Sequence, residues 1–241
     1  MLRFFRLLRK KLLEEGHIRK YIWYALGEIL LVMIGILLAL QVNNWNQERQ
    51  MKADEKMLLK NVLLALETDS TAFESAILKM NDAFEVYEML YELSQNEILA
   101  DSLKNTHLMR RSISDYPVSL GTYPELASEV IDPLVKEAVI EYYSSLEAWI
   151  SIQQNYNDFI ENVMRPFLGK IGVLNYGYHH ENPGELDKLL NNQVLIDALD
   201  QQEVQQMLFE AAVKTRNLEG VYQQGMENRK ILIYQINRVI Q

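Results

Sequence analysis

Residues 132–167, DPLVKEAVIEYYSSLEAWISIQQNYNDFIENVMRPF, predict a long amphipathic helix. Asp132 is an acidic N-cap residue, and Pro133 suits the first helical position because its missing N–H is not needed there. Seam residues then recur at alternating spacings of four and three: Val135, Val139, Tyr142, Leu146, Trp149, Gln153, Tyr156, Ile160, Val163 and Phe167. Because this alternation places one narrow stripe on a helix, we expect a helix that ends by Gly169 and packs through this seam.

Two further segments carry the same spacing. No glycine or proline occurs between Gly35 and Pro117, so a helix can run without interruption to about residues 94–96. Its expected seam is Leu58, Val62, Ala65, Asp69, Ala72, Ala76, Met80, Phe84, Tyr87 and Tyr91. The third seam reaches the C-terminus through Val204, Leu208, Ala211, Thr215, Leu218, Tyr222, Gly225, Arg229, Leu232, Ile236 and Val239. Narrow seams of this kind favour helices that pack at small crossing angles.

We therefore expect an all-α fold: a single N-terminal transmembrane helix followed by an elongated antiparallel helical bundle of three long helices plus shorter ones. The shorter pieces, near residues 97–111 and 185–199, are expected to act as partial fourth helices. Each long helix is expected to reverse the one before it, so that the third runs parallel to the first. We also expect Asp69 and Arg229 to pair across the seam, because a lone buried charge is costly.

Residues 21–42 predict the transmembrane helix. The segment is about 33 Å long as a helix, which matches a hydrocarbon core of about 30 Å. Its length and the lack of a small-x-small cleavage site indicate an uncleaved signal-anchor. Aromatic residues suited to the two membrane interfaces flank it: Tyr21, Trp23 and Tyr24 at one end, and Trp45 at the other.

The distribution of basic residues predicts the orientation of this helix. Seven Lys/Arg residues lie in the first 20 positions, which indicates a cytoplasmic N-terminus. The expected domains are a cytoplasmic basic amphipathic segment (1–20), the transmembrane helix (21–42) and a periplasmic helical bundle (43–241), in a protein of the bacterial inner membrane. The first segment either lies flat on the anionic inner leaflet or supplies only the charge that sets the orientation.

Two stretches resemble a known family. KYIWYALGEILLVMIGILLALQVNNWNQER (20–49) and TYPELASEVIDPLVKEAVIEYYSSLE (122–147), with the pair Tyr142 and Tyr143, are similar to a domain-of-unknown-function family of small single-pass inner-membrane proteins widespread in Bacteroidota. Glu129 and Val130 depart from the Ser-Gly type of turn that we expect there. The resemblance implies an inner-membrane protein with a periplasmic domain, and it implies no particular activity.

Glu28 lies unexpectedly within the apolar run and shares a helical face with Gly35 and Ala39. Small residues four apart let membrane helices approach closely, and a polar side chain on the same face can form a hydrogen bond across the contact. We therefore expect Glu28, Gly35 and Ala39 to form a helix contact in the membrane. In the alternative interpretation, Glu28 pairs with Lys20 or Arg19 near the cytoplasmic headgroups, or is protonated.

Composition and motifs argue against several functional classes. The chain has a net charge of −9, and residues 43–241 carry 17 basic against 30 acidic residues, which argues against binding to nucleic acid. With no cysteine, it has no disulfide, thiolate nucleophile or thiolate zinc site. We find no phosphate-binding loop, nucleophile elbow or metalloprotease motif, so we expect no enzyme, cofactor or metal. His179, His180 and Glu181 come closest to a metal site, and a solvated loop is the preferred interpretation.

Two aromatic loops suggest where a ligand or partner could bind. One contains Tyr116 and Tyr123, and the other contains Tyr176 and Tyr178. These tyrosines either form an interaction patch or cap the ends of the bundle.

The functional prediction is a non-enzymatic interaction or scaffold protein, anchored in the lipid bilayer, that presents its periplasmic bundle to a protein partner or to its own copies. One alternative is a periplasmic ligand-sensing module that signals through a separate membrane partner. A less favoured alternative is a subunit of an ion-coupled membrane complex that uses Glu28, which rests on similarity of layout alone.

Overall fold

The computed structural model describes residues 18–95, 98–119, 126, 128–182, 184–186 and 188–241. It confirms the all-α fold. The helices are α2 (Ile18–Ser94), α4 (Pro133–Phe159), α5 (Arg165–Lys170), α6 (Tyr176–Glu181), α7 (Asn192–Asp197) and α8 (Gln202–Ile240), with two 3₁₀ helices, η1 (Ala100–Ser102) and η2 (Thr106–Arg110), and a π-helical turn, η4 (Ile160–Met164). The chain divides into two compact units, Met1–Asp54 and Glu55–Gln241.

The described part of the first unit is helical and contains one long apolar stretch. Within the described residues, one helix is long and apolar enough to cross a membrane by length and composition, with a mean hydropathy of 2.4 in its most apolar window. None of that window is buried by protein. Leu31, for example, is 74% exposed. The segment predicted as a transmembrane helix is therefore helical and uncovered.

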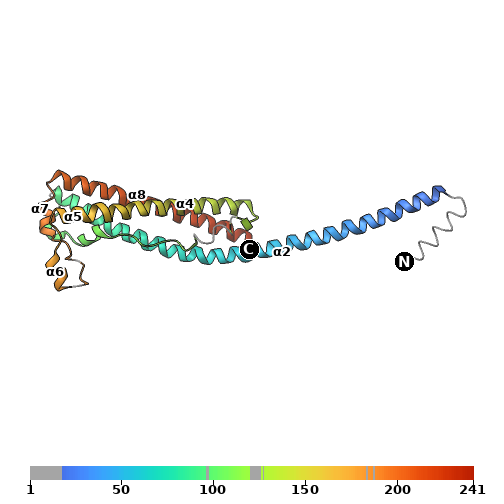
Figure 1. Ribbon diagram of the computed structural model, residues 1–241, viewed down its shortest axis with the longest axis horizontal. Helices are drawn as coiled ribbons and strands as arrows, with labels where there is room; N and C mark the ends of the chain where they lie inside the picture. Colours follow the sequence, from blue (N-terminus) through green and yellow to red (C-terminus); the bar gives the residue numbers. More distant parts are fainter. Residues whose placement is uncertain (1–17, 96–97, 120–125, 127, 183, 187) are drawn as a thin grey trace. The chain divides into compact units, whose positions relative to one another are not determined.

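In the second unit, α2 and α4 run in the same direction (Figure 1). The Glu55 carboxylate accepts a hydrogen bond of 3.1 Å from the backbone N–H of Asp132, at the start of α4. Further along both helices, the Tyr142 hydroxyl donates to the Asp69 carboxylate over 2.7 Å. Residue numbers rise together along the two helices, so α2 and α4 are parallel.

Helix α8 runs antiparallel to both of them. Arg238, near its end, forms an ion pair of 2.7 Å with Asp132 at the start of α4. In the middle of the bundle, the rings of Trp149 and Tyr222 lie 5.0 Å apart between centroids. The expectation that each long helix reverses the one before it is therefore wrong for α2 and α4. The expectation that the third long helix runs parallel to the first is also wrong, because α8 is antiparallel to α2.

The connection between α2 and α4 explains this topology. Short connections favour antiparallel neighbours, whereas a long connection can return along the bundle. Residues 111–119, which we call the strap, are almost entirely without regular secondary structure. The side chain of Asn157 on α4 bonds both the N–H and the C=O of Ile113, each over 2.8 Å, and Gln153 donates to the carbonyl of Asp115 over 3.0 Å.

Helix α2 holds the other end of the strap. The buried Asp69 carboxylate accepts from the N–H groups of Val118 (2.5 Å) and Ser119 (3.1 Å). Lys79 forms an ion pair of 2.6 Å with Asp115. Because a non-helical backbone must find partners for its polar groups, polar residues in the helix seams supply them. The strap thus takes the place of a fourth helix.

The predicted partial fourth helices do not form as expected. In residues 98–111 only the short helices η1 and η2 occur, separated by Asn105 in the left-handed conformation (φ 57°). In the described part of 185–199, the helix is the six-residue α7.

Asp69 and Arg229 do not pair with each other. Asp69 has its partners on the strap and in Tyr142, as described above. Arg229 donates instead to the backbone carbonyl of Leu66, three residues earlier on α2. Arg229 therefore meets α2 within one helical turn of the predicted position, but its partner is a backbone carbonyl and not the Asp69 carboxylate.

The seams mostly follow the predicted spacing, with one difference in α2. Its buried residues form a stripe that alternates by four and three, with Val86 buried beside it: Glu55, Leu59, Val62, Leu66, Asp69, Phe73, Ala76, Met80, Ala83, Tyr87 and Leu90. Four residues of the predicted seam flank this stripe half-buried, and Tyr91 is 61% exposed; the four are Leu58, Ala65, Ala72 and Phe84. The larger side chains of Leu59, Leu66 and Phe73 therefore determine which face of the helix packs.

In α4, the π-helical turn at Ile160–Met164 shifts the seam by one residue. Val163, which was expected in the core, is 41% exposed, while Met164 is fully buried. A π turn inserts one extra residue into a helix, so the positions after it move by one. Helix α8 keeps its predicted seam, with Val204, Ala211, Leu218, Tyr222, Leu232 and Ile236 buried.

Candidate functional site

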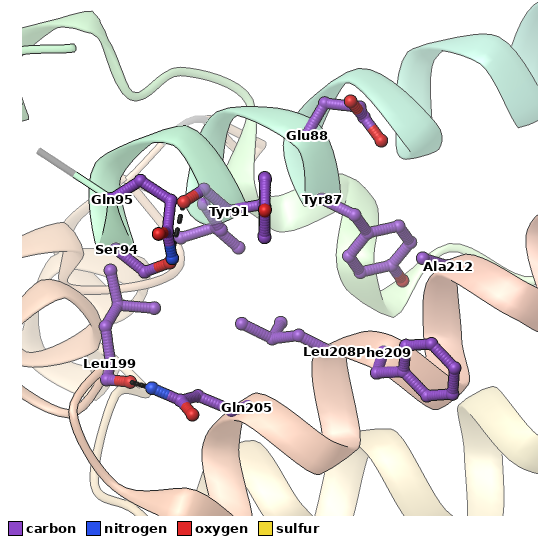
Figure 2. Close-up of a pocket in the computed structure, with 11 residues that line it drawn as sticks. Tyr87, Glu88, Tyr91, Ser94, Gln95, Leu199, Gln205, Leu208, Phe209 and Ala212 are labelled. Atoms are coloured by element: carbon purple, nitrogen blue, oxygen red, sulfur yellow. Dashed lines mark hydrogen bonds between the residues drawn. The ribbon is translucent and has the colours of Figure 1, made fainter. Parts of the chain in front are cut away.

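A pocket of about 420 Å³ lies between the last turns of α2 and the first turns of α8 (Figure 2). This size falls in the range of small-ligand sites. Its apolar walls are formed by Leu90, Tyr91, Leu199, Leu208, Phe209 and Ala212.

The local fold keeps this pocket open. Helix α2 ends at Ser94, and the chain enters α8 through a turn in which the Gln205 side chain donates to the carbonyl of Leu199 over 3.0 Å. The facing residue Ala212 is small, so it leaves space opposite Tyr87. At the pocket mouth, Tyr91 is 61% exposed and Phe209 is 70% exposed. Two aromatic rings therefore flank the entrance.

Tyr87 is the unusual residue of this pocket. Its side chain projects from α2 toward α8, beside Ala212 and Phe209 (Figure 2). The residue is 3% exposed, and its hydroxyl has no hydrogen-bond partner among the residues that the structure describes. Burial, followed by the neighbouring Tyr156, raises the pKa of Tyr87 well above its usual value. The hydroxyl is therefore a protonated donor without an acceptor.

The buried polar residues of α4 and α8 around the strap differ from Tyr87, because each of them has a hydrogen-bond partner. Gln153 accepts from Trp149 Nε1 (2.5 Å) and from the Tyr222 hydroxyl (2.6 Å), while its amide donates to the strap. The Tyr143 hydroxyl donates to the Ser119 carbonyl over 2.7 Å. Burial, followed by the Asp69 carboxylate, raises the pKa of Tyr142. These contacts account for the network as a structural support of the strap.

The residues predicted to form a membrane contact lie on one helix. Within α2, Glu28 is partly exposed, and Gly35 and Ala39 are exposed. A Cβ atom added at Gly35 would meet nothing within 4 Å, so no described residue packs against this position. Of the predicted interface anchors, Trp23 and Trp45 are exposed, and Tyr21 and Tyr24 lie in helical backbone.

The loop tyrosines lie at two separate places. Tyr116 follows Asp115, which is held beside Gln153 in the middle of α4. Tyr176 begins α6, which follows the end of α5 at Lys170. The 17 residues of helix from Gln153 to Lys170 correspond to about 25 Å, so the structure does not bring Tyr116 and Tyr176 together. Tyr123 lies outside the described residues.

The second aromatic segment is a short helix, α6, in place of the expected loop. Tyr176 is 80% exposed and stacks on His180, with ring centroids 6.2 Å apart. The Tyr178 hydroxyl donates to the Glu185 carboxylate. Among the described residues, no group of three His, Cys, Asp or Glu side chains is arranged to hold a metal ion.

Comparison with protein-family models, with curated proteins and with solved structures found no match to this chain. The resemblance in residues 20–49 and 122–147 therefore rests on the sequence pattern alone.

The pocket could not be recognised from the sequence. Tyr87 and Leu208 were assigned to core seams, and nothing in the spacing shows that the seam opens there. The signal that was present is Phe209, a large aromatic residue outside the α8 seam.

Proposed function

We propose that this chain is a single-pass protein of the bacterial inner membrane that presents residues 43–241 in the periplasm as a non-enzymatic interaction module. One observation carries the proposal: an apolar helical window of the first unit has none of its surface buried by protein. Uncovered apolar surface of this extent is typical of contact with lipid. The excess of Lys/Arg in the first 20 residues supports the orientation.

Cysteine labelling of the full chain tests the orientation, because the chain has no native cysteine. In intact spheroplasts, a membrane-impermeant maleimide should label Gln241→Cys and should label Glu14→Cys only after the membrane is permeabilised. Both variants should remain in the membrane pellet after alkaline carbonate extraction. Labelling of Glu14→Cys in intact spheroplasts, or release of the chain by carbonate, would contradict the proposal.

The partner contact in this proposal is the membrane face formed by Glu28, Gly35 and Ala39. Replacing Gly35 by leucine fills the space that allows close approach of two helices. Chemical cross-linking in native membranes should therefore lose its main product, with a second copy or another protein, in Gly35→Leu. The matched control Ile36→Leu should retain it. An equal yield from both variants would exclude this face as the contact.

A second candidate function is the ligand-sensing module, and the pocket between α2 and α8 favours it. Small ligands that bind only the folded state raise its stability. A shift of the melting temperature of the full chain by a small molecule would support sensing. A stoichiometric protein partner that is retained in the absence of small molecules would favour the interaction module.

A further inference from the structure

The Tyr87 hydroxyl is a buried hydrogen-bond donor without an acceptor among the described residues. A buried donor that is left without a partner costs about 1–3 kcal/mol, and phenylalanine would fill the same space without that penalty. The hydroxyl belongs to a residue that lines a pocket, and no described residue accepts from it. A molecule in the pocket that carries an acceptor oxygen would satisfy it.

The other lining residues restrict the chemistry of that molecule. The walls are mostly aliphatic and aromatic, which favours an apolar body. Glu88 is the charged residue among those that line the pocket, so an anion would meet a like charge without a compensating cation. The side chains of Ser94 and Gln205 already donate hydrogen bonds to the backbone carbonyls of Tyr91 and Leu199, so Tyr87 is the buried donor that remains for a ligand.

The Tyr87 hydroxyl is shielded from solvent, so a ligand in the pocket reaches it only when a neighbouring side chain moves. Figure 2 shows the Phe209 ring on the same side of the pocket as the hydroxyl, next to Ala212. Phe209 is 70% exposed. Exposed side chains change rotamer within nanoseconds, so this ring can move aside while the helices stay in place.

We propose that the pocket between α2 and α8 binds a neutral, largely apolar small molecule whose carbonyl or ether oxygen accepts a hydrogen bond from Tyr87. This inference goes beyond the interaction module proposed above and does not depend on its orientation in a membrane. Aromatic or aliphatic groups of the ligand pack against Leu90 and Leu208, and the rings of Tyr91 and Phe209 cover it at the mouth.

Benzophenone is a suitable probe because it is neutral, has two aromatic rings and one carbonyl, and inserts into nearby C–H bonds on irradiation. The full chain in lipid nanodiscs is irradiated over a range of benzophenone concentrations, and labelled peptides are quantified by mass spectrometry. Labelling of peptides that contain residues 87–95 and 205–212 should saturate. Labelling of the apolar segment at residues 25–42 should rise in proportion to the probe in the lipid, and it serves as the internal reference.

Two variants and one control test whether the saturable labelling arises from this pocket. Tyr87→Phe should raise the half-saturating concentration by about three- to tenfold, the value of one hydrogen bond, without loss of folded protein. Leu208→Trp, which fills the pocket, should abolish the saturable labelling, whereas Gln223→Trp at an exposed position of α8 should leave it unchanged.

The outcomes separate clearly. Saturable labelling that is weakened by Tyr87→Phe supports the proposal. Labelling of these peptides that rises only in proportion to the reference overturns the pocket as a binding site. Saturable labelling that Tyr87→Phe leaves unchanged overturns the assigned hydrogen bond.

Discussion

At Gly225, helix α8 packs directly against the Phe73 ring of α2. A Cβ atom at this position would lie 2.6 Å from Cε1 and 2.7 Å from Cζ of Phe73, closer than real contacts allow. We expect Gly225→Ala to destabilise the fold by about 1–3 kcal/mol, although alanine is the better helix former. Chemical denaturation of the full chain measures this change.

Gly220 supplies the control for that substitution. A Cβ atom at Gly220 would meet nothing within 4 Å, so Gly220→Ala should stabilise the fold by about 0.5–1 kcal/mol. In a Phe73→Leu background the penalty of Gly225→Ala should shrink, as a double-mutant cycle would show. If both alanine variants are equally stable, the close approach of Phe73 is not limiting.

Gln153 joins the core to the strap through a single side chain. Its replacement by leucine would leave the Trp149 N–H, the Tyr222 hydroxyl and the Asp115 carbonyl without their partner. Since each buried unsatisfied group costs about 1–3 kcal/mol, we expect Gln153→Leu to lose about 3 kcal/mol or more of folding stability. The exposed Gln154→Leu should stay within about 0.5 kcal/mol of the parent. A loss below 1 kcal/mol for Gln153→Leu would show that water replaces the missing partner.

At the scale of elements, the π-helical turn gives a direct test of register. Deleting the exposed Asn162 removes the extra residue of the turn, so α4 can continue as a regular helix with Met164 and Leu168 still on the buried face. We expect this deletion to retain the helical content and a cooperative unfolding transition. Circular dichroism during thermal unfolding measures both quantities.

Deletion of Gln154 is the matched control, because it also removes one exposed residue but lies within regular α-helix. It rotates the following residues by about 100° and turns Tyr156 and Ile160 away from the core. This variant should therefore lose cooperative unfolding. If the two deletions are equally well tolerated, the π turn does not contain the extra residue that sets the register of the buried positions after it.

The extents of the long helices could be predicted from local signals. Asp132 and Pro133 mark the start of α4, and the Asp132 side chain indeed accepts from the N–H groups of Leu134 and Val135. The π turn could not be predicted in this way, because its extra residue becomes visible only when Met164 and Val163 are compared in the folded core. Likewise, the predicted buried face of α2 differs from the observed one. Apolar residues occur on neighbouring stripes of this helix, and the packing of the other helices determines which stripe is buried.

At the scale of the whole chain, the relative direction of the long helices could not be predicted from the spacing of their seam residues. A heptad seam is the same when read from either end, so parallel and antiparallel packing fit the same pattern. The information was present in polar seam residues such as Asp69 and Gln153, which bind a returning backbone, and in the length of the connection. The pocket was missed for a related reason: Tyr87, Leu199 and Phe209 meet only when α8 runs antiparallel to α2.

Buried tyrosines make the bundle sensitive to alkaline pH. Burial raises the pKa of Tyr87, Tyr142 and Tyr222, and it raises the pKa of Tyr156 to about 12. An unfolded tyrosine has a pKa of about 10. Below pH of about 10, both states keep these protons, and the full stability is present. Above it the unfolded chain releases protons that the folded chain keeps, so the free energy of unfolding falls as pH rises.

For Tyr156 alone, this loss amounts to about 1.4 kcal/mol per pH unit between about pH 10 and pH 12. We therefore expect cooperative alkaline unfolding in this range, in which the loss of helical circular dichroism coincides with a step in tyrosinate absorbance. Tyr156→Phe removes one linked proton and should shift the transition to higher pH, whereas Tyr234→Phe, at a 68% exposed position, should not. Gradual ionisation of all tyrosines while the helical signal persists would show that the buried hydroxyls exchange protons without unfolding, and that burial does not protect them.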